Sequence, residues 1–197
     1  HSAQVGNVGL PIVYAVADDE EYEFFAVELS SFQLHWTYSL SPLASVVLNV
    51  ADDHVDWHGS FEAYKAAKAR IYENTQVACI FNEDHADTRR MVEEADVVEG
   101  ARAVSISSTE IPRVSMLGLA EDILVDRAFL KDRYHQALEL GVLTDLAQAP
   151  GQVTAQHTVE NALAAAALTR AAVIAPEHVS EGLSKYSPGA VTYQHPR

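Results

Sequence analysis

Short runs of apolar residues alternate along the chain with longer segments whose apolar residues recur at helical spacing. The runs with the strongest strand character are residues 22–29 (YEFFAVEL), 44–50 (ASVVLNV) and 77–82 (VACIFN). Continuous apolar runs of this length are typical of strands buried on both faces of a parallel sheet. A helical pattern lies between the last two runs, so residues 44–82 are predicted to form one strand–helix–strand unit.

The other segments extend this pattern. Helices are predicted to begin near Pro11 and to cover residues 84–95, 157–173 and 176–186. Short β-prone runs around residues 97–130 predict a smaller β-rich part with smaller or antiparallel strands. The whole pattern predicts an α/β fold in three layers, a mostly parallel sheet flanked by helices. We expect one domain over residues 1–190, followed by a tail or linker at residues 191–197.

The charge of the chain narrows the classes of partner. The 197 residues include 28 acidic residues against 13 lysines and arginines, which gives a formal net charge of -15. Such a balance argues against non-specific binding to nucleic acid or to an anionic membrane. An anionic substrate would need metal ions or local basic residues to offset the negative field.

Cysteine content and hydropathy indicate the compartment. Cys79 is the single cysteine, so no internal disulfide can form, and its apolar neighbours predict a core position. No run approaches the roughly 20 apolar residues of a membrane span, and the N-terminal residues lack a basic-then-apolar signal pattern. We expect a soluble protein of the cytoplasm.

Lys68 lies at an unusual position for a lysine. In the predicted helix of residues 60–75, the positions Phe61, Tyr64, Ile71 and Thr75 share a face with Lys68. An ammonium group is costly to desolvate on an apolar face. The lysine could extend its head to water. Alternatively, a neutral amine at this position could form a Schiff base, or add CO₂ to give a carbamate that binds Mg²⁺.

Polar residues follow the predicted strands, where ligands of parallel sheets bind. Glu28 ends the first strand, and it could bind Mg²⁺ near phosphate oxygens, while the serines after it could simply cap a helix. The acidic and histidine-rich residues 52–58 follow the second strand and could form a metal or acid–base loop around His54, or a solvated turn. Residues 82–85 follow the third strand. Three polar strand ends at one edge would form one site.

His157 and Asn161 are four residues apart on a predicted helix and therefore share a face. They could be ordinary polar residues of the first turns. They could also form a polar wall for a nucleotide base.

Three segments in this order and spacing resemble the central domain of the Mur ligase family. They are ELSSFQL (28–34), LNVADDHVDWH (48–58) and YKAAKARIYEN (64–74). GNVGLP (6–11) and HTVENA (157–162) match as well. The resemblance is close over residues 1–82 and looser over residues 151–186, and it implies the ATPase-type three-layer fold of that domain. ELSSFQL is similar to the branch that adds D-glutamate to UDP-N-acetylmuramoyl-L-alanine.

The resemblance implies an ATP-dependent ligase of peptidoglycan precursor synthesis that works through an acyl phosphate. Carried over by motif, Glu28 would bind one Mg²⁺, and Lys68, as a carbamate formed with CO₂, would hold a second. His54 would lie at that metal or at the acyl phosphate. The remaining implied contacts are Asn7, Ser30 and Gln33 with the UDP-sugar substrate, and His157 and Asn161 with ATP.

The chain departs from the family pattern at several points. It holds no run of the type G-x-x-G-K followed by Ser or Thr, the loop that binds phosphates in this family. We therefore expect a central-domain fragment that does not hydrolyse or use ATP by itself. Residues 191–197 are expected to lead toward a C-terminal ligase domain. Thr158 stands where the family has asparagine, and Pro196 interrupts the His-Arg pair that the family has near this point.

Two other classes of function are open to the sequence. A metal-dependent hydrolase could use the two imidazoles and the carboxylates of residues 52–58 to bind Zn²⁺ or Mn²⁺. A truncated, inactive binding domain is the other alternative, in which Lys68 would be an ordinary amine.

Overall fold

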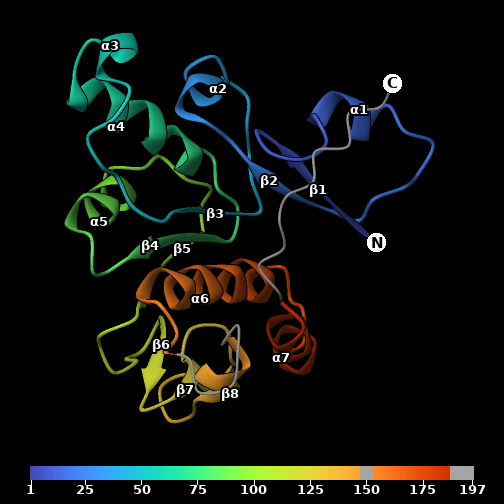
Figure 1. Cartoon of the computed structure of the whole chain (residues 1–197), viewed down its shortest axis with the longest axis vertical. Coiled ribbons are helices and arrows are strands. Elements are labelled where there is room, and N and C mark those ends of the chain that lie inside the picture. Colours follow the sequence, from blue (N-terminus) through green and yellow to red (C-terminus); the bar gives the residue numbers. More distant parts are fainter. Residues whose placement is uncertain (147–152, 187–197) are drawn as a thin grey trace. The chain divides into compact units, whose positions relative to one another are not determined.

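The computed structural model describes residues 1–146 and 153–186, which form two compact units (Figure 1). The first unit comprises His1–Tyr38 and the second begins at Ser39. The expected tail at residues 191–197 lies outside the described residues, and a single domain over residues 1–190 stays a prediction. The mixed α/β class is confirmed by the element order of both units.

The first unit is a small parallel sheet with two short helices. Strand β1 (Ser2–Gly6) pairs with β2 (Phe24–Glu28), α1 (Ile12–Val16) connects them, and α2 (Ser31–His35) follows. The register places Gly6 opposite Glu28. Gly6 has a φ of +118°, and a Cβ there would lie 2.1 Å from the carbonyl oxygen of Glu28. Only glycine permits this close approach of the two strands.

The second unit contains a six-stranded sheet in the order β3-β4-β5-β6-β7-β8. Its strands are β3 (Ala44–Val47), β4 (Ala78–Asn82), β5 (Arg102–Ser107), β6 (Met116–Ala120), β7 (Ile123–Asp126) and β8 (Leu138–Val142). The first four strands are parallel, and the last two continue the sheet in antiparallel pairing. The parallel pair β3–β4 confirms the predicted strand–helix–strand unit.

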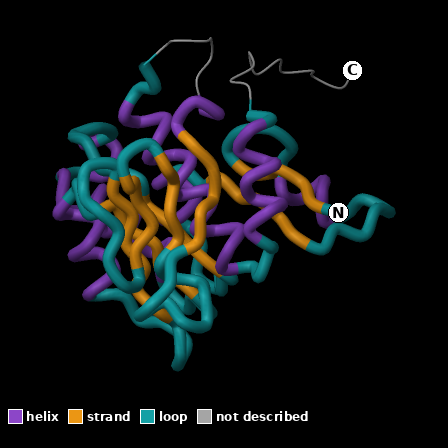
Figure 2. Tube along the Cα trace, turned by 90° about the horizontal axis from the view of Figure 1, so that it is seen from below, coloured by secondary structure: helices purple, strands orange, loops and turns teal. Residues whose placement is uncertain are grey.

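Helices cover the parallel part of this sheet in two layers (Figures 1 and 2). On one side lie α4 (Phe61–Ala69), the 3₁₀ turn η1 (Arg70–Tyr72) and α5 (Ala86–Glu93), which follow the short helix α3 (Val55–His58). On the other side lies α6 (Gln156–Ala171), beside α7 (Pro176–Ser184). Side chains alternate across the sheet. Ile80 therefore joins the core beneath α6, while Cys79 joins a smaller core with Tyr72, as expected for a buried thiol.

The helix predicted over residues 60–75 ends earlier than expected. Its regular part stops at Ala69, and the chain tightens into η1 before Asn74 adopts a left-handed φ of +56°. Asparagine tolerates this conformation, which ends helices. Thr75 therefore does not belong to the helical face: it lies in the connection between η1 and β4, where it is buried and its hydroxyl lies 2.8 Å from that of Ser45.

The β-rich part around residues 97–130 is confirmed, but with a different pairing from that expected. Strands β5 and β6 extend the parallel sheet, and only β7 and β8 are antiparallel. Strand β8 lies beyond the predicted segment. Within residues 1–146 and 153–186, no helix is long and apolar enough to cross a membrane.

Candidate active site

Asn7 and Glu28 meet at the carboxyl end of the small sheet. The backbone nitrogen of Asn7 donates to the Glu28 carbonyl at 2.7 Å, and Asn7 Nδ2 donates to Glu28 Oε1 at 3.4 Å. The pairing of Gly6 with Glu28 fixes this geometry. Two residues that are 21 positions apart in the sequence are thus brought together, with the carboxylate exposed at the strand end.

Ser30 and Gln33 form a capping box at the start of α2. Gln33 Oε1 accepts from the Ser30 backbone nitrogen at 2.9 Å, and Ser30 Oγ accepts from the Gln33 backbone nitrogen at 3.2 Å. This reciprocal pattern satisfies two donors at the helix start. The capping alternative for Ser30 is therefore realised, and it fixes the turn directly after Glu28.

The loop after β3 carries His54 in a strained conformation. His54 has a φ of +53°, which costs a non-glycine residue about 1–2 kcal/mol. Asp53 supports it on two sides: its Oδ1 accepts from the His54 backbone nitrogen at 2.8 Å, and its Oδ2 lies 3.3 Å from His54 Nε2. The imidazole is 45% exposed. Strained and accessible residues of this kind are frequent in functional sites.

Lys68 and His54 both contact the ring of Tyr64, the residue one turn before Lys68 on α4. Lys68 Nζ lies 5.6 Å from the ring centroid, and the His54 ring lies 6.0 Å away at an interplanar angle of 71°. The ring of His58 lies 5.4 Å away. We refer to His54, His58, Tyr64 and Lys68 as the Tyr64 cluster. Two of the predicted catalytic residues therefore lie around one aromatic ring.

Burial raises the pKa of Tyr64, and the nearby Asp53 carboxylate raises it further. The phenol thus stays neutral near pH 7. The sequence predicts Tyr64 on the apolar face of the helix, but it does not predict the contact with His54. Its position four residues before Lys68 is the signal that could have identified it as a contact of that side chain.

Lys65, one turn away from Phe61 on the same helix, has an ordinary environment for a lysine. Its Nζ lies 2.8 Å from Glu62 and 3.3 Å from Asp87. The hydrogen bond to Glu62 raises the pKa of Lys65, and Asp87 adds to the effect against the opposing influence of burial. Lys65 is therefore held as a cation and serves as a comparison for Lys68.

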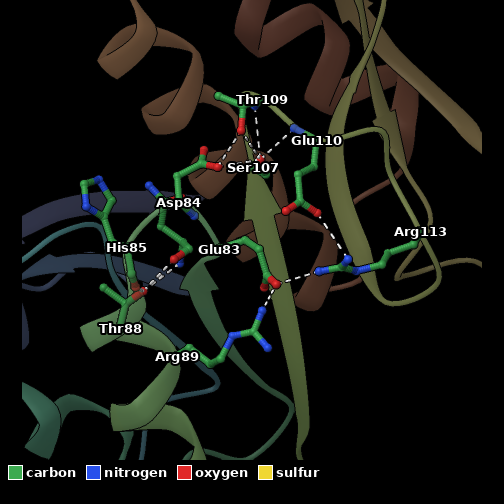
Figure 3. A network of polar contacts seen from close by, with 10 residues as sticks. Glu83, Asp84, His85, Thr88, Arg89, Ser107, Thr109, Glu110 and Arg113 are labelled. Atoms are coloured by element: carbon green, nitrogen blue, oxygen red, sulfur yellow. Dashed lines mark hydrogen bonds and ion pairs between the residues drawn. The ribbon is translucent and has the colours of Figure 1, made fainter.

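The two acidic residues that follow β4, Glu83 and Asp84, are engaged within the fold (Figure 3). Asp84 accepts hydrogen bonds from Ser107 Oγ at 2.8 Å, Thr109 Oγ1 at 2.7 Å and the Ser108 backbone nitrogen at 3.0 Å. Burial would raise the pKa of Asp84, but the hydroxyls of Thr109 and Ser107 and the Ser108 amide lower it below its usual value. We refer to Asp84 with residues 107–109 as the Asp84 network.

Glu83 is also neutralised by its neighbours. Arg89 and Arg113 both contact its carboxylate, which is 5% exposed, and Arg113 also pairs with Glu110 at 3.2 Å (Figure 3). The expectation that this strand end offers carboxylates to a ligand is therefore not supported by the contacts. Its acidic side chains join β4 to the segment after β5.

His157 and Asn161 lie on the exposed side of the first turns of α6 and line one end of a cavity of about 570 Å³ between α6 and α7. Glu160, on the same helix, is buried. Its carboxylate accepts hydrogen bonds from Gln156 Nε2 at 2.9 Å and from Ser108 Oγ at 3.4 Å. The structure therefore brings His157 and Asn161 together and ties their helix to the end of β5.

The sequence offers two possible sets of metal ligands, one within residues 52–58 and one made of Glu28, His54 and Lys68. Among the residues that the structure describes, no group of three or more His, Cys, Asp or Glu is placed to hold a metal ion. The hydrolase alternative requires such a group within residues 52–58. The set of Glu28, His54 and Lys68 includes a lysine and draws on both units, so their mutual spacing stays a prediction.

Comparisons with known proteins identify related chains. The family model of the Mur ligase middle domain matches residues 4–169. The UDP-N-acetylmuramoylalanine--D-glutamate ligase of Leifsonia xyli subsp. xyli is 48% identical over 189 residues, which are 93% of this chain and 36% of that protein. The ligase of the same name from Streptomyces avermitilis is 47% identical, over 98% of this chain and 40% of its own length. The chain thus spans about two fifths of these relatives.

Solved structures show the same fold. A UDP-N-acetylmuramoyl-L-alanyl-D-glutamate--2,6-diaminopimelate ligase superposes with a TM-score of 0.62 at 21% identity, over 85% of this chain and 34% of that one. MurF from Acinetobacter baumannii gives a TM-score of 0.52 at 15% identity, over 94% of this chain and 45% of its own.

Proposed function

Because the chain belongs to the Mur ligase middle-domain family, we propose that it serves as the middle domain of an ATP-dependent ligase joining D-glutamate to UDP-N-acetylmuramoyl-L-alanine. The observation that carries this proposal is the identity of 47–48% with two ligases named for D-glutamate addition, over nearly the whole chain. Such a ligase acts in peptidoglycan precursor synthesis. The reduced, buried thiol of Cys79 fits the cytoplasm, where we place the reaction.

The reaction has two steps that conserve atoms and charge. The carboxylate of the L-alanine unit attacks the γ-phosphorus of ATP and displaces ADP, which gives an acyl phosphate. The amine of D-glutamate then attacks the acyl carbon, loses a proton, and phosphate leaves as the amide forms. Catalysis of phosphoryl transfer depends mainly on positioning and on neutralisation of charge.

Two Mg²⁺ ions would neutralise phosphate charge on a protein whose own net charge is -15. The residues that would hold them are Glu28, His54 and Lys68. The exposed carboxylate of Glu28 is the hard oxygen donor that Mg²⁺ prefers. Lys68 would offer the same chemistry after its neutral amine adds CO₂ and releases one proton, which leaves an anionic carbamate. His54 would contribute its accessible imidazole.

The substrate contacts follow from the positions of the other predicted residues. Asn7, Ser30 and Gln33 would face the UDP-sugar substrate beside Glu28. His157 and Asn161 would face the base of ATP, and the support for this is that both line one end of the cavity between α6 and α7.

The test compares the two lysines of α4 in the full-length ligase that carries this chain. Lys68→Ala is expected to lower the rate of amide formation by about 10³-fold, as for loss of a group that stabilises charge in the transition state. Short-chain carboxylates, which mimic the carbamate, should restore part of the rate. Lys65→Ala is the matched control and should stay within about threefold of the wild type, because Lys65 is paired with Glu62 and Asp87 and is assigned no part in binding magnesium or substrate. Wild-type rates in Lys68→Ala would refute the proposed role.

Carbamylation has a readout that needs no turnover. With ¹³C-bicarbonate, the wild-type chain should give a carbamate carbon signal in NMR spectra. The signal should vanish in Lys68→Ala and persist in Lys65→Ala. A signal that disappears in neither variant would assign the carbamate to another amine.

A further inference from the structure

Tyr72 is a fully buried tyrosine whose hydroxyl lies between two strands of the sheet. The Val47 amide donates to this hydroxyl at 2.8 Å, and the hydroxyl donates to the Ile80 carbonyl at 2.6 Å. In the register of β3 and β4, Val47 lies opposite Phe81, the residue after Ile80, so this amide and this carbonyl face each other. The hydroxyl therefore joins the two strands at one position of their ladder.

The same hydroxyl holds the end of the helix that carries Lys68. Tyr72 is the last residue of η1, which continues directly from α4, and it lies about one helical turn after Lys68. Its ring belongs to the smaller core, together with Val47 and Met91. An apolar ring of similar size could fill that space. Only the hydroxyl fixes where the helix end lies along the two strands, because a hydrogen bond permits a narrow range of distances and angles.

Both strands lead into the candidate site. Val47 is the last residue of β3, and the loop that follows carries His54. Burial raises the pKa of Tyr72 far above its usual value, against the opposing effect of the Val47 amide, so the hydroxyl stays protonated and can donate to Ile80. One neutral group thus relates the helix of Lys68 to the strand before His54, whatever the charge on Lys68.

We propose that Tyr72 is a positioning residue of this ligase, whose hydroxyl holds the end of the Lys68 helix against the strand that leads to His54. The proposal rests on the function proposed above, because it concerns the placement of the same two residues. Tyr72 acts only through the elements that it joins. A misplacement of reacting groups by about 1 Å can cost about 100-fold in rate, and loss of one hydroxyl from a retained ring should cost about 10-fold.

Ser45 offers a matched control on the same strand. Its hydroxyl is also buried and lies 2.8 Å from Thr75 Oγ1, in the connection between η1 and β4. Ser45 is two residues further from the His54 loop than Val47 is. Ser45→Ala and Tyr72→Phe each remove one buried hydroxyl, so a similar loss of stability is expected. A purely structural role would give both substitutions the same effect on catalysis.

The kinetic test uses both variants in the full-length ligase that carries this chain. Tyr72→Phe should lower kcat about 10-fold with the KM for ATP within about threefold of the wild type. Ser45→Ala should keep kcat within about twofold, although its unfolding midpoint in denaturant should shift as much as that of Tyr72→Phe. An unchanged kcat in Tyr72→Phe, or an equal loss in Ser45→Ala, would overturn the proposal. If Lys68→Ala is inactive while Tyr72→Phe is fully active, the positioning role fails and the ligase function stands.

Two spectroscopic measurements follow the geometry without turnover. With ¹³C-bicarbonate, the carbamate carbon signal of Lys68 should change its chemical shift in Tyr72→Phe and stay in place in Ser45→Ala. An unchanged signal in Tyr72→Phe would contradict the proposal. The other measurement needs no variant that folds: in NMR spectra of the full-length wild type, the Tyr72 hydroxyl proton should exchange slowly with water and show cross-relaxation with the Val47 amide proton. Absence of this cross-peak would also overturn the proposal.

Discussion

The loop that carries Asp53 and His54 and the Asp84 network follow neighbouring strands of the sheet, but their polar side chains are in opposite situations. Asp84 is surrounded by hydroxyls and amides of the chain itself, and its carboxylate accepts from residues 107–109. Asp53 and His54 belong to an exposed loop, with side chains 63% and 45% exposed, and His54 has a strained backbone. Asp84 therefore joins β4 to the segment that begins at the end of β5, whereas the side chains of Asp53 and His54 face solvent.

Structural and functional charges at strand ends can be distinguished by their partners and their exposure. A carboxylate whose oxygens accept from hydroxyl and amide donors of its own fold stabilises that fold, since losing it leaves donors without acceptors. A polar residue that is exposed and held at a cost in backbone energy is better explained by a ligand. Substitutions in the two regions should therefore differ in their effects on catalysis and on stability.

The largest expected effect is on catalysis. In the proposed full-length ligase, His54→Ala should lower the rate of amide formation by about 10²–10³-fold, because the role that we propose for His54 is at the metal or at the acyl phosphate. Asp84→Asn should stay within about fivefold of the wild type, because Asp84 is engaged within the fold. Steady-state assays of phosphate release check both values. A larger loss for Asp84→Asn than for His54→Ala would reverse the assignment of the two regions.

The next largest effect is on the free energy of unfolding. Here the substitution of Asp84, rather than that of His54, should have the larger effect. Asp84→Asn should lower the free energy of unfolding by about 1–3 kcal/mol at pH 7, because an amide cannot accept all the hydrogen bonds of the carboxylate. The folded state lowers the pKa of Asp84 below the unfolded value of about 3.9. Its contribution is therefore complete above that value and is lost as the pH falls through the lower folded pKa.

Denaturant titrations at several pH values measure this dependence. The difference between wild type and Asp84→Asn should be constant above about pH 5 and should shrink below about pH 4. The substitution Glu99→Gln, at an exposed position, should change stability by less than about 0.5 kcal/mol. A difference that is independent of pH would show that the carboxylate charge has no part in the network.

The smallest effect concerns the backbone of His54. Glycine adopts a positive φ without steric cost, so His54→Gly should be about 1 kcal/mol more stable than His54→Ala. Both variants should be catalytically impaired to a similar extent, since both lack the imidazole. Thermal or denaturant unfolding of the pair measures the strain directly. Equal stability would mean that the loop relaxes once the imidazole is removed.

The sequence allowed the parallel core to be predicted because its signals are local. The apolar runs around Val46 and Ile80, with a helix between them, specify a buried parallel pair, and Cys79 is buried as expected. The end of α4 was missed because it depends on the left-handed conformation of Asn74. Strand β8 was missed because Glu139 and Gly141 interrupt its apolar pattern, and because it pairs with β7, whose antiparallel direction no local signal reveals.

The site was only partly predictable for a related reason. His54 and Lys68 were identified from local motifs, and their common contact with Tyr64 was not, because the contact joins a loop to a helix. Asp84 follows a buried strand and therefore looked available to a ligand. Its hydrogen-bond partners, residues 107–109, lie more than 20 positions away in the sequence, where a local pattern does not reveal them. Whether a charge is already satisfied depends on such distant partners, and no local pattern reveals it.

The close approach of β1 and β2 leaves no space for a side chain at Gly6. A single methyl group there would overlap the carbonyl oxygen of Glu28, so β1 and β2 would have to separate or rotate. Either movement would displace the carboxylate of Glu28 and the amide of Asn7 together, since both are attached to those two strands. A change from glycine to alanine would therefore disturb the pairing of the sheet and the position of the Glu28 carboxylate, the magnesium ligand that we propose, in one event.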